Sequence, residues 1–401
     1  MKVSIVIYSL NIGGAENSIL NMARIFMKNG HDVWIIESEN KGPWNKYFKE
    51  SGVKVKTFAL RLLSIPYFHS LKIAKELRQF DVIFLIDSPF AQAALGKLKI
   101  NAKSFPQLRA NLQSMYFNAS ANNTQWNYII AVSPLLKEDF ILNYPELTGR
   151  IKVIPNGIPI PPKRSINYSN LRRYNIIYIG RLDNTFKGVL LIPEIVKQLI
   201  LNGHDLSITI TGEGPAKQDM VRLINAYNLQ SYFIFLGFVP KDTISELLCK
   251  HDFLIMPSSS EGFPNVMLEA MANQVIPVVS LINGVTDVCV TDSINGFFGQ
   301  PGDVSSYVNA FERAFSMRDK LNEVSLNAYK TVKEQYSIDI MEHSYLELMS
   351  KCDGCIITRS NKIDIRFLKR HYPFVYLPYF VGRIVTKFLS RIRALTDTEF
   401  I

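Results

Sequence analysis

The sequence predicts an α/β protein of two Rossmann-like domains that face each other across a cleft, followed by a basic aromatic carboxyl-terminal tail. Three observations support this prediction. Short apolar and β-branched runs alternate with amphipathic segments, the alternation restarts after a proline-rich stretch near residue 160, and basic residues gather after residue 356. Such alternation is typical of a parallel sheet covered on both faces by helices.

Residues 1–160 are expected to form the amino-terminal domain. Residues 2–8 form an apolar run of strand length, and residues 16–28 repeat apolar side chains at helical spacing. Further strands are predicted over 33–37, 54–58, 82–86 and 128–132. The stiff run Ile158-Pro159-Ile160-Pro161-Pro162 then marks a domain boundary.

Residues 161–335 repeat the pattern and are expected to form a second domain, from which a helix near 336–350 returns to the first. The predicted strands cover 175–179, 206–211, 233–236, 253–256 and 276–279, and the predicted helices cover 188–201, 217–227 and 243–250, with another before the last strand. Each half opens with a strand, a glycine turn and a helix. Ligands are therefore expected beyond the carboxyl ends of the strands, in the interdomain cleft.

Composition excludes several classes of protein. With 401 residues, 47% apolar and 20% charged, the chain is globular and not disordered. It has no apolar stretch of about 18 residues that could span a bilayer, and no cleavage site follows the first apolar run, so a cytoplasmic protein is expected. The single C-x-x-C of Cys352 and Cys355 lacks the further ligands of a zinc site and is expected to be two incidental thiols, although a redox pair is the alternative.

The most informative stretch runs from Ser260 to Glu269. Pro264 suits the start of a helix, and Gly262 allows a ligand to approach the backbone. Asn265 and Glu269 are four residues apart and share a face of an otherwise apolar helix. A carboxylate there is costly unless it binds something polar. The alternative is a buried glutamate paired with an arginine elsewhere.

This stretch, EGFPNVMLEAM, resembles the signature of the large retaining glycosyltransferase family with the GT-B fold, which has two glutamates eight positions apart. The resemblance implies that Glu261 faces hydroxyls of the transferred sugar and that Glu269 binds the ribose of the nucleotide, with Asn265 on the same face. It also implies that the amides of Gly262 and Phe263 meet the sugar or diphosphate. Free N–H groups at a helix amino terminus favour anions, which agrees with this role.

A second match is Gly180-Arg181-Leu182 followed by Phe186-Lys187-Gly188. In the similar enzymes this arginine and lysine hold the diphosphate. The leaving group gains negative charge as the glycosidic bond breaks, and fixed cations stabilise it most at that moment. Glu261, Arg181 and Lys187 are therefore the expected catalytic residues.

Several smaller elements fit the same family. Gly14 lies in the glycine turn after the first strand, which taken alone is only structural, and Gly212 lies in the loop Thr211–Pro215. By resemblance, backbone near Phe238 contacts the base of the donor. The runs 154–157 and 295–297 match the family as turns.

The chain departs from the family at two places. The family often has a histidine in an amino-domain loop, whereas this chain has none between His69 and His204. The corresponding loop is expected at residues 105–110, so Gln107, Arg109 or, after another strand, Asp87 are the candidate contacts. Residues 271–274 read Met-Ala-Asn-Gln where a small residue and glycine are more usual, which is expected to alter only a turn.

No metal ion or other cofactor is expected. No Asp-x-Asp motif stands in a suitable loop, and the nearest approach, Asp397-Thr398-Glu399, is at the chain end. The nucleotide sugar is a substrate, and a UDP-sugar is the expected donor.

The carboxyl-terminal tail, residues 356–401, concentrates positive charge. Nine basic residues and one acidic residue lie between Ile356 and Thr396, giving +8 against +10 for the chain. An aromatic run at 372–380 precedes an apolar stripe of Val381, Ile384, Val385, Phe388, Ile392 and Leu395. These features predict a segment attracted to anionic lipid. The alternatives are a helix docked on the amino-terminal domain or a dimer contact. Nucleic acid is not an expected partner, because the folded body is not notably basic.

The expected function is retaining transfer of a sugar to a lipid-linked or growing glycan acceptor, in surface polysaccharide, lipopolysaccharide or glycolipid synthesis. The enzyme is expected to be peripheral on the inner face of the plasma membrane. A nucleotide-sugar epimerase of the same fold and a non-catalytic glycosyltransferase-like partner subunit are the alternatives. A dinucleotide-dependent oxidoreductase is excluded because the first glycine turn lacks G-x-G-x-x-G.

Overall fold

The computed structural model describes residues 1–164, 168, 173–352 and 357–396, with side chains of the last helix up to Lys387. These residues form two compact units. The first unit comprises Met1–Val132, Lys137–Ile154 and Ser344–Ile401, and the second comprises Ser133–Leu136 and Pro155–His343. The division after Ile154 comes shortly before the proline-rich run, and the end of the chain belongs to the first unit.

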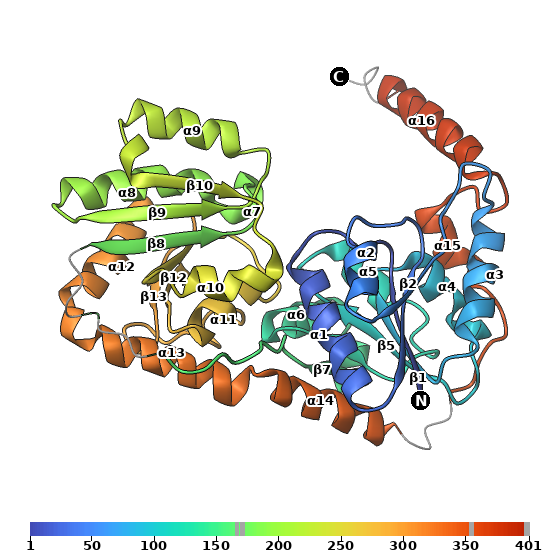
Figure 1. The fold of residues 1–401 in the computed structure, drawn as a ribbon. Helices are drawn as coiled ribbons and strands as arrows, with labels where there is room; N and C mark the ends of the chain where they lie inside the picture. The colour runs from blue at the N-terminus through green and yellow to red at the C-terminus, as the bar shows by residue number, and fades with distance from the viewer. Residues whose placement is uncertain (165–167, 169–172, 353–356, 397–401) are drawn as a thin grey trace. The chain divides into compact units, whose positions relative to one another are not determined.

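A seven-stranded parallel sheet forms the centre of the first unit, with the strand order β3-β2-β1-β4-β5-β6-β7 (Figure 1). Its strands are β1 (Lys2–Ile7), β2 (Asp32–Glu37), β3 (Lys54–Thr57), β4 (Val82–Ile86), β5 (Lys103–Leu108), β6 (Ile129–Ala131) and β7 (Ile151–Val153). The helices from this half of the chain are α1 (Gly14–Lys28), α2 (Asn45–Glu50), α3 (Pro66–Leu77), α4 (Pro89–Ala94), α5 (Gln113–Ser120) and α6 (Pro134–Asn143).

The second unit contains a six-stranded parallel sheet with the order β10-β9-β8-β11-β12-β13 (Figure 1). Its strands are β8 (Tyr174–Ile179), β9 (Leu206–Thr211), β10 (Phe233–Gly237), β11 (Phe253–Met256), β12 (Ile276–Ser280) and β13 (Phe297–Gly299). The helices are α7 (Asn184–Lys187), α8 (Ile192–Leu201), α9 (Lys217–Ala226), α10 (Ile244–Leu248), α11 (Asn265–Ala272), α12 (Val304–Ser316) and α13 (Leu321–Gln335). The helix α14 (Ile338–Lys351) then leads back to the first unit.

The two units confirm the predicted α/β fold with two Rossmann-like parallel sheets. In each sheet the strand order reverses at one point, between β1 and β4 in the first and between β8 and β11 in the second. Ligands of such sheets bind outside the carboxyl ends of the strands at the reversal. The loops after these four strands are therefore where a site is to be sought.

Three short strands differ from the sequence prediction. The expected loop at 105–110 is wrong, because residues 103–108 form β5, which is buried in the sheet. β7 was not predicted, and Phe297 starts β13 where a turn was expected. Each of these strands is short or contains proline or glycine, which weakens its periodic signal.

Residues 357–380 pack on the first unit, which differs from the expectation of a separate tail over 356–401 and agrees with the alternative of a docked segment. The guanidinium of Arg359 is largely buried and donates from Nη2 to the Ala102 carbonyl at 2.5 Å and from Nε to the Lys99 carbonyl at 3.2 Å. Backbone N–H groups of Asn361 and Asp364 donate to the carbonyls of Gly96 and Ala93 at 2.8 and 2.9 Å. The side chains of Ile357, Ile363, Phe367, Leu368 and Val375 are buried.

Two helices complete this segment, α15 (Ile365–His371), which contacts α3 and α4, and α16 (Tyr379–Thr396). Val381, Ile384 and Val385 of the predicted apolar stripe lie on the described part of α16. The side chains of Phe388, Ile392 and Leu395, and the residues Cys355, Asp397, Thr398 and Glu399, lie outside the described residues. Within the described part of the chain, no helix has both the length and the apolar content needed to cross a membrane.

Candidate functional site

The loop after β8 carries the two predicted cations at the reversal point of the second sheet. Asp183 caps α7 by accepting from the Thr185 N–H at 2.8 Å, and Gly188 ends this short helix with a left-handed φ of +59°. A Cβ on Gly188 would lie 2.2 Å from the Pro257 carbonyl oxygen, so only glycine allows this approach. The Ser259 N–H also donates to the Phe186 carbonyl at 2.8 Å. The loops after β8 and β11 are thus fixed to each other.

Lys187 and Glu261 form the central ion pair of this site. Lys187 Nζ lies 2.6 Å from Glu261 Oε1, and the two side chains are 32% and 10% exposed. Arg181 is not part of this pair, because its side chain is 70% exposed and its Nε lies 3.7 Å from Asp183 Oδ2. The structure therefore brings together two of the three predicted catalytic residues and leaves Arg181 at the surface.

The helix α11 presents the remaining predicted donor-binding groups. It begins at Asn265, whose Oδ1 accepts from Asn156 Nδ2 at 2.7 Å. The ring of Phe263 is buried against Tyr336, with ring centroids 5.6 Å apart, so only its backbone faces the loop. Among the residues that the structure describes, the amides of Gly262 and Phe263 have no hydrogen-bond acceptor. These amides and the amino terminus of α11 favour an anion.

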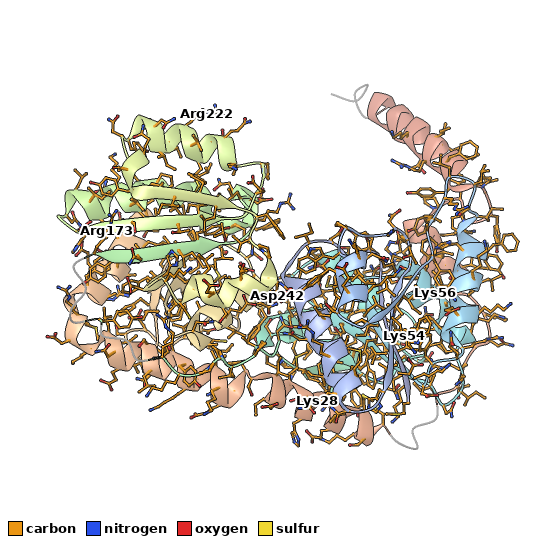
Figure 2. All side chains as sticks on the ribbon, in the orientation of Figure 1. Lys28, Lys54, Lys56, Arg173, Arg222 and Asp242 are labelled. Atoms are coloured by element: carbon orange, nitrogen blue, oxygen red, sulfur yellow. The ribbon has the colours of Figure 1, made fainter. Side chains whose placement is uncertain are left out.

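Glu269 has a cationic partner that the sequence did not reveal. Lys241 Nζ forms an ion pair with Glu269 Oε1, and the glutamate side chain is 13% exposed. Lys241 lies in the loop after β10, beside Asp242, which Figure 2 labels. A ligand or an arginine was the expected partner, and a lysine five residues after the end of the predicted strand 233–236 was the available signal.

Gly212 and Phe238 follow the two outer strands of the same sheet edge. Gly212 has φ +113°, and its N–H donates to the Gly237 carbonyl at 2.7 Å. A Cβ on Gly212 would lie 1.9 Å from the Gly180 carbonyl oxygen. The residue therefore holds the loops after β8, β9 and β10 close together, whereas the Phe238 side chain is 56% exposed.

The first unit places Gln107 differently from the expectation, whereas Gly14 lies at the expected junction of the first strand and the first helix. Gly14 is exposed and starts α1. In the same turn Glu16 is buried, its Oε1 accepts from the Asn11 N–H at 3.2 Å, and burial raises the pKa of its carboxyl. Gln107 lies on the buried strand β5 and donates from Nε2 to the Tyr345 hydroxyl at 3.3 Å.

Arg109 directly follows β5 and is also buried. Its Nε donates to Gln107 Oε1 and its Nη1 to Ser18 Oγ, both at 2.9 Å. Burial lowers the pKa of its guanidinium, and nearby Glu16 opposes that shift. Gln107 and Arg109 thus belong to an interior polar network of the first unit and not to an open loop.

Asp87 directly follows β4, at the reversal point of the first sheet. It has a left-handed φ of +46°, which is strained for a residue other than glycine, and such strain clusters at functional sites. Its Oδ1 accepts from Asn118 Nδ2 at 2.8 Å.

Asp87 also has neighbours that the sequence analysis missed. Glu39 follows β2. Burial raises the pKa of its carboxyl, the charge of Asp87 raises it further, and a hydrogen bond from Tyr372 opposes the shift. Burial lowers the pKa of His371, and the charge of Asp87 opposes this shift. Because His371 and Tyr372 come from the end of the chain, only their aromatic character could have drawn attention to them.

No three His, Cys, Asp or Glu side chains gather as a metal site within the part of the chain that the structure describes. Independence of metal ions stays a prediction.

Comparison with known proteins identifies both units. The model of the "Glycosyl transferases group 1" family matches residues 160–331, and that of "Glycosyltransferase Family 4" matches residues 12–160. The chain is 27% identical over 384 residues to an uncharacterized glycosyltransferase of Methanocaldococcus jannaschii, covering 84% of this chain and 95% of that protein.

It is also 24% identical over 358 residues to the phosphatidylinositol N-acetylglucosaminyltransferase GPI3 subunit of Saccharomyces cerevisiae, covering 81% of this chain and 77% of that protein. Among solved structures, HepE of Anabaena in complex with UDP and glucose superposes with a TM-score of 0.74 at 19% identity, over 88% of this chain and 100% of the other. Together the two family models cover residues 12–331, and the chain is therefore a glycosyltransferase with the GT-B fold.

Proposed function

We propose that this glycosyltransferase moves a sugar from a nucleotide diphosphate sugar to a lipid-linked or growing glycan acceptor with retention of configuration. The observation that carries the proposal is the Lys187–Glu261 pair at the reversal point of the second sheet, beside the amides of Gly262 and Phe263. HepE of Anabaena binds UDP and glucose, which supports a UDP-sugar as the donor here.

Each group has a role in this reaction. The ammonium of Lys187 and the exposed guanidinium of Arg181 bind the diphosphate, on which negative charge grows as the glycosidic bond breaks. Glu261 accepts hydrogen bonds from sugar hydroxyls. Glu269 and Asn265 accept from the ribose, and backbone near Phe238 contacts the base.

Retention follows from attack on the face that the diphosphate leaves. The acceptor oxygen forms the new bond to the anomeric carbon, and the departing phosphate oxygen takes the acceptor proton. The second unit then needs no separate base, and its cations take the place of a metal ion.

The acceptor and the cellular location are part of the proposal. The yeast relative is named for transfer to phosphatidylinositol, which supports an acceptor carried on a lipid. Together with the nine basic residues after Ile356, it supports the proposal of a cytoplasmic enzyme, peripheral on the inner face of the plasma membrane, in surface polysaccharide, lipopolysaccharide or glycolipid synthesis.

A hydrolysis screen tests the proposal. Purified protein is incubated with UDP-, GDP- and ADP-sugars, and release of nucleoside diphosphate is measured with and without EDTA. We expect one donor to be hydrolysed, EDTA to have no effect, and Glu261→Gln to abolish the release. Lys250→Ala, which removes an exposed ion pair with Glu246, is the control.

Three results would contradict the proposal. If EDTA abolishes the activity and magnesium or manganese restores it, the metal-free site is contradicted. Release of a sugar altered at one carbon indicates the epimerase. No hydrolysis and no nucleotide binding indicate the non-catalytic partner subunit.

A further inference from the structure

We propose that the first unit holds a pocket for the phosphate group of a lipid-borne acceptor, between the first turns of α16 and the turn after α15. This inference rests on the proposed function, because it names the acceptor of that reaction and the phosphate group through which the enzyme binds it.

The pocket is a cavity of about 270 Å³ within the first unit. This volume is just below the range of about 300–1,000 Å³ that takes drug-sized ligands, so it suits a headgroup and not a whole glycan. Its walls are formed by Pro66 of α3, by the turn from His371 to Phe374, and by one side of α16 that includes Tyr379, Gly382, Arg383, Thr386 and Lys387.

Backbone hydrogen bonds fix these walls to each other. The N–H groups of Tyr379 and Phe380 donate to the carbonyls of Ser64 and Leu62 at 2.8 and 3.0 Å, and the Tyr67 N–H donates to the Val375 carbonyl at 3.0 Å. The pocket is thus built from two segments far apart in the sequence, both held on the same unit.

Two cations of α16 line the pocket. Arg383 and Lys387 are four residues apart and share a face of the helix. The guanidinium of Arg383 lies 5.7 Å from the centre of the Tyr379 ring, and none of the acidic groups that the structure describes forms an ion pair with it. A guanidinium binds phosphate through parallel hydrogen bonds, and a lysine supplies a point charge. This wall is therefore complementary to a phosphate.

The inner wall leads to the acidic groups at the sheet edge. Tyr372 and His371 line the pocket, and Tyr372 hydrogen-bonds Glu39, while the charge of Asp87 acts on His371. The Nε2 atom of His371 is buried without a hydrogen-bond partner among the described residues. The wall opposite the cations is thus formed by residues that contact or sense the carboxylates of Glu39 and Asp87, and carboxylates accept hydrogen bonds from sugar hydroxyls.

Exposed apolar side chains around the pocket indicate that the ligand is carried on a lipid. They come from the same two segments that form the walls: Leu62, Leu63 and Phe68 from one, and Tyr376, Leu377, Phe380 and Ile384 from the other. The rings of Tyr67 and Tyr376, 5.3 Å apart, join the two segments. An exposed apolar patch with cations at its centre is typical of a surface that lies on an anionic membrane.

The test compares two variants with the same loss of charge. Arg383→Gln/Lys387→Gln removes the cations of the pocket, and Arg366→Gln/Lys369→Gln removes two exposed cations of α15 that do not line it. Full-length proteins are sedimented with vesicles of phosphatidylcholine alone, or mixed with phosphatidic acid or phosphatidylserine. Glycerol 3-phosphate is added as a soluble competitor, and thermal unfolding checks each fold.

We expect the intact protein to prefer phosphatidic acid, and the pocket variant to lose this preference and bind roughly 30-fold more weakly, since each basic residue near such a surface contributes about 1 kcal/mol. The α15 variant should keep the preference. Equal losses in both variants overturn the pocket. A rise in Tm with glycerol 3-phosphate in a protein that binds no vesicles also overturns the lipid-borne ligand, because it indicates a free phosphate ligand.

Donor hydrolysis by the intact protein separates this inference from the proposed function. A protein that hydrolyses a donor but binds all vesicles equally has the function and not the pocket. A protein that selects phosphatidic acid without hydrolysing any donor has the lipid site, but the site is then not that of an acceptor.

Discussion

Lys187 Nζ lies 2.6 Å from Glu261 Oε1, although 74 positions of sequence separate the two residues. The pair joins the loop after β8 to the loop after β11, at the point where the strand order of the second sheet reverses. It holds both side chains in place before any donor arrives, and such preorganisation lowers the cost of stabilising charge in the transition state.

Lys187→Ala should lower kcat/KM for donor turnover by roughly 10²-fold, the usual effect of removing one group that stabilises developing charge. The variant should stay folded, because Glu261 retains some access to solvent. Steady-state kinetics and thermal unfolding measure both effects, with Lys250→Ala as the control. Near-normal turnover at a donor concentration below saturation would mean that Lys187 does not act on the donor.

The Lys241–Glu269 pair separates a binding role from a structural one. If Glu269 accepts hydrogen bonds from the ribose, Glu269→Gln should raise KM roughly 10- to 100-fold, because a hydrogen bond to a charged group contributes about 1.5–3 kcal/mol. Lys241→Met should change KM much less. Donor KM and Tm are measured for both variants. Equal losses of Tm with no change in KM in either variant would show that the pair is only structural.

Gly212→Ala should destabilise the second unit more than Gly203→Ala. Both glycines have a positive φ, which costs about 1–2 kcal/mol for any other residue. Only Gly212 is also crowded, by the Gly180 carbonyl oxygen, whereas nothing lies within 4 Å of a Cβ on Gly203. Urea unfolding gives the difference in free energy. Equal destabilisation would show that the loops after β8 and β9 can separate freely.

A chain that ends at Thr358 should not fold stably, whereas one that ends at Lys387 should keep its Tm. The shorter chain loses Arg359 and the buried Phe367 and Leu368, and each buried apolar side chain contributes about 1.5–3 kcal/mol. Soluble yield and thermal unfolding decide this. A folded, soluble chain ending at Thr358 would show that the docked segment is dispensable.

Glu39→Gln should raise Tm at pH 7 and lower transfer to the acceptor. Burial raises the pKa of Glu39 above its unfolded value, and Asp87 adds to this, while the Tyr372 hydroxyl opposes it. The folded protein therefore binds more protons than the unfolded chain near this pKa, so the glutamate costs stability as pH rises. The gain in Tm should shrink as pH falls toward 4.5. A gain that is equal at both pH values would mean that the charge of Glu39 is not destabilising.

Local patterns were sufficient to predict most strands of the two sheets and the motifs around Glu261 and Lys187, since strands such as β4 are continuous apolar runs, whereas β5, β7 and β13 were missed. They also pointed to the turn after α11, where Gln274 adopts a left-handed φ of +59° at a position that usually holds glycine. The partners across the fold could not be predicted. Lys241 pairs with Glu269 through the order of strands in the sheet, and periodicity carries no information on that order.

The same limit applies to the end of the chain. Its charge and aromatic residues suggested a separate surface segment, but nothing local showed that Arg359 would be buried with backbone carbonyls as partners. Burial lowers the pKa of this guanidinium to about 10, which shows how far it is removed from water.

Arg359 has a consequence for the order of folding during synthesis. Its hydrogen bonds reach residues more than 230 positions earlier, at Gln125, Ala102 and Lys99. Domains usually fold in the order in which they leave the ribosome. Here the second unit is complete at His343, while the first still lacks the part of α14 from Ser344 onward, α15 and the buried side chains of the last segment. The domain that is translated first is therefore the one that finishes last, and its apolar surface around α4 stays open to chaperones until the end of translation.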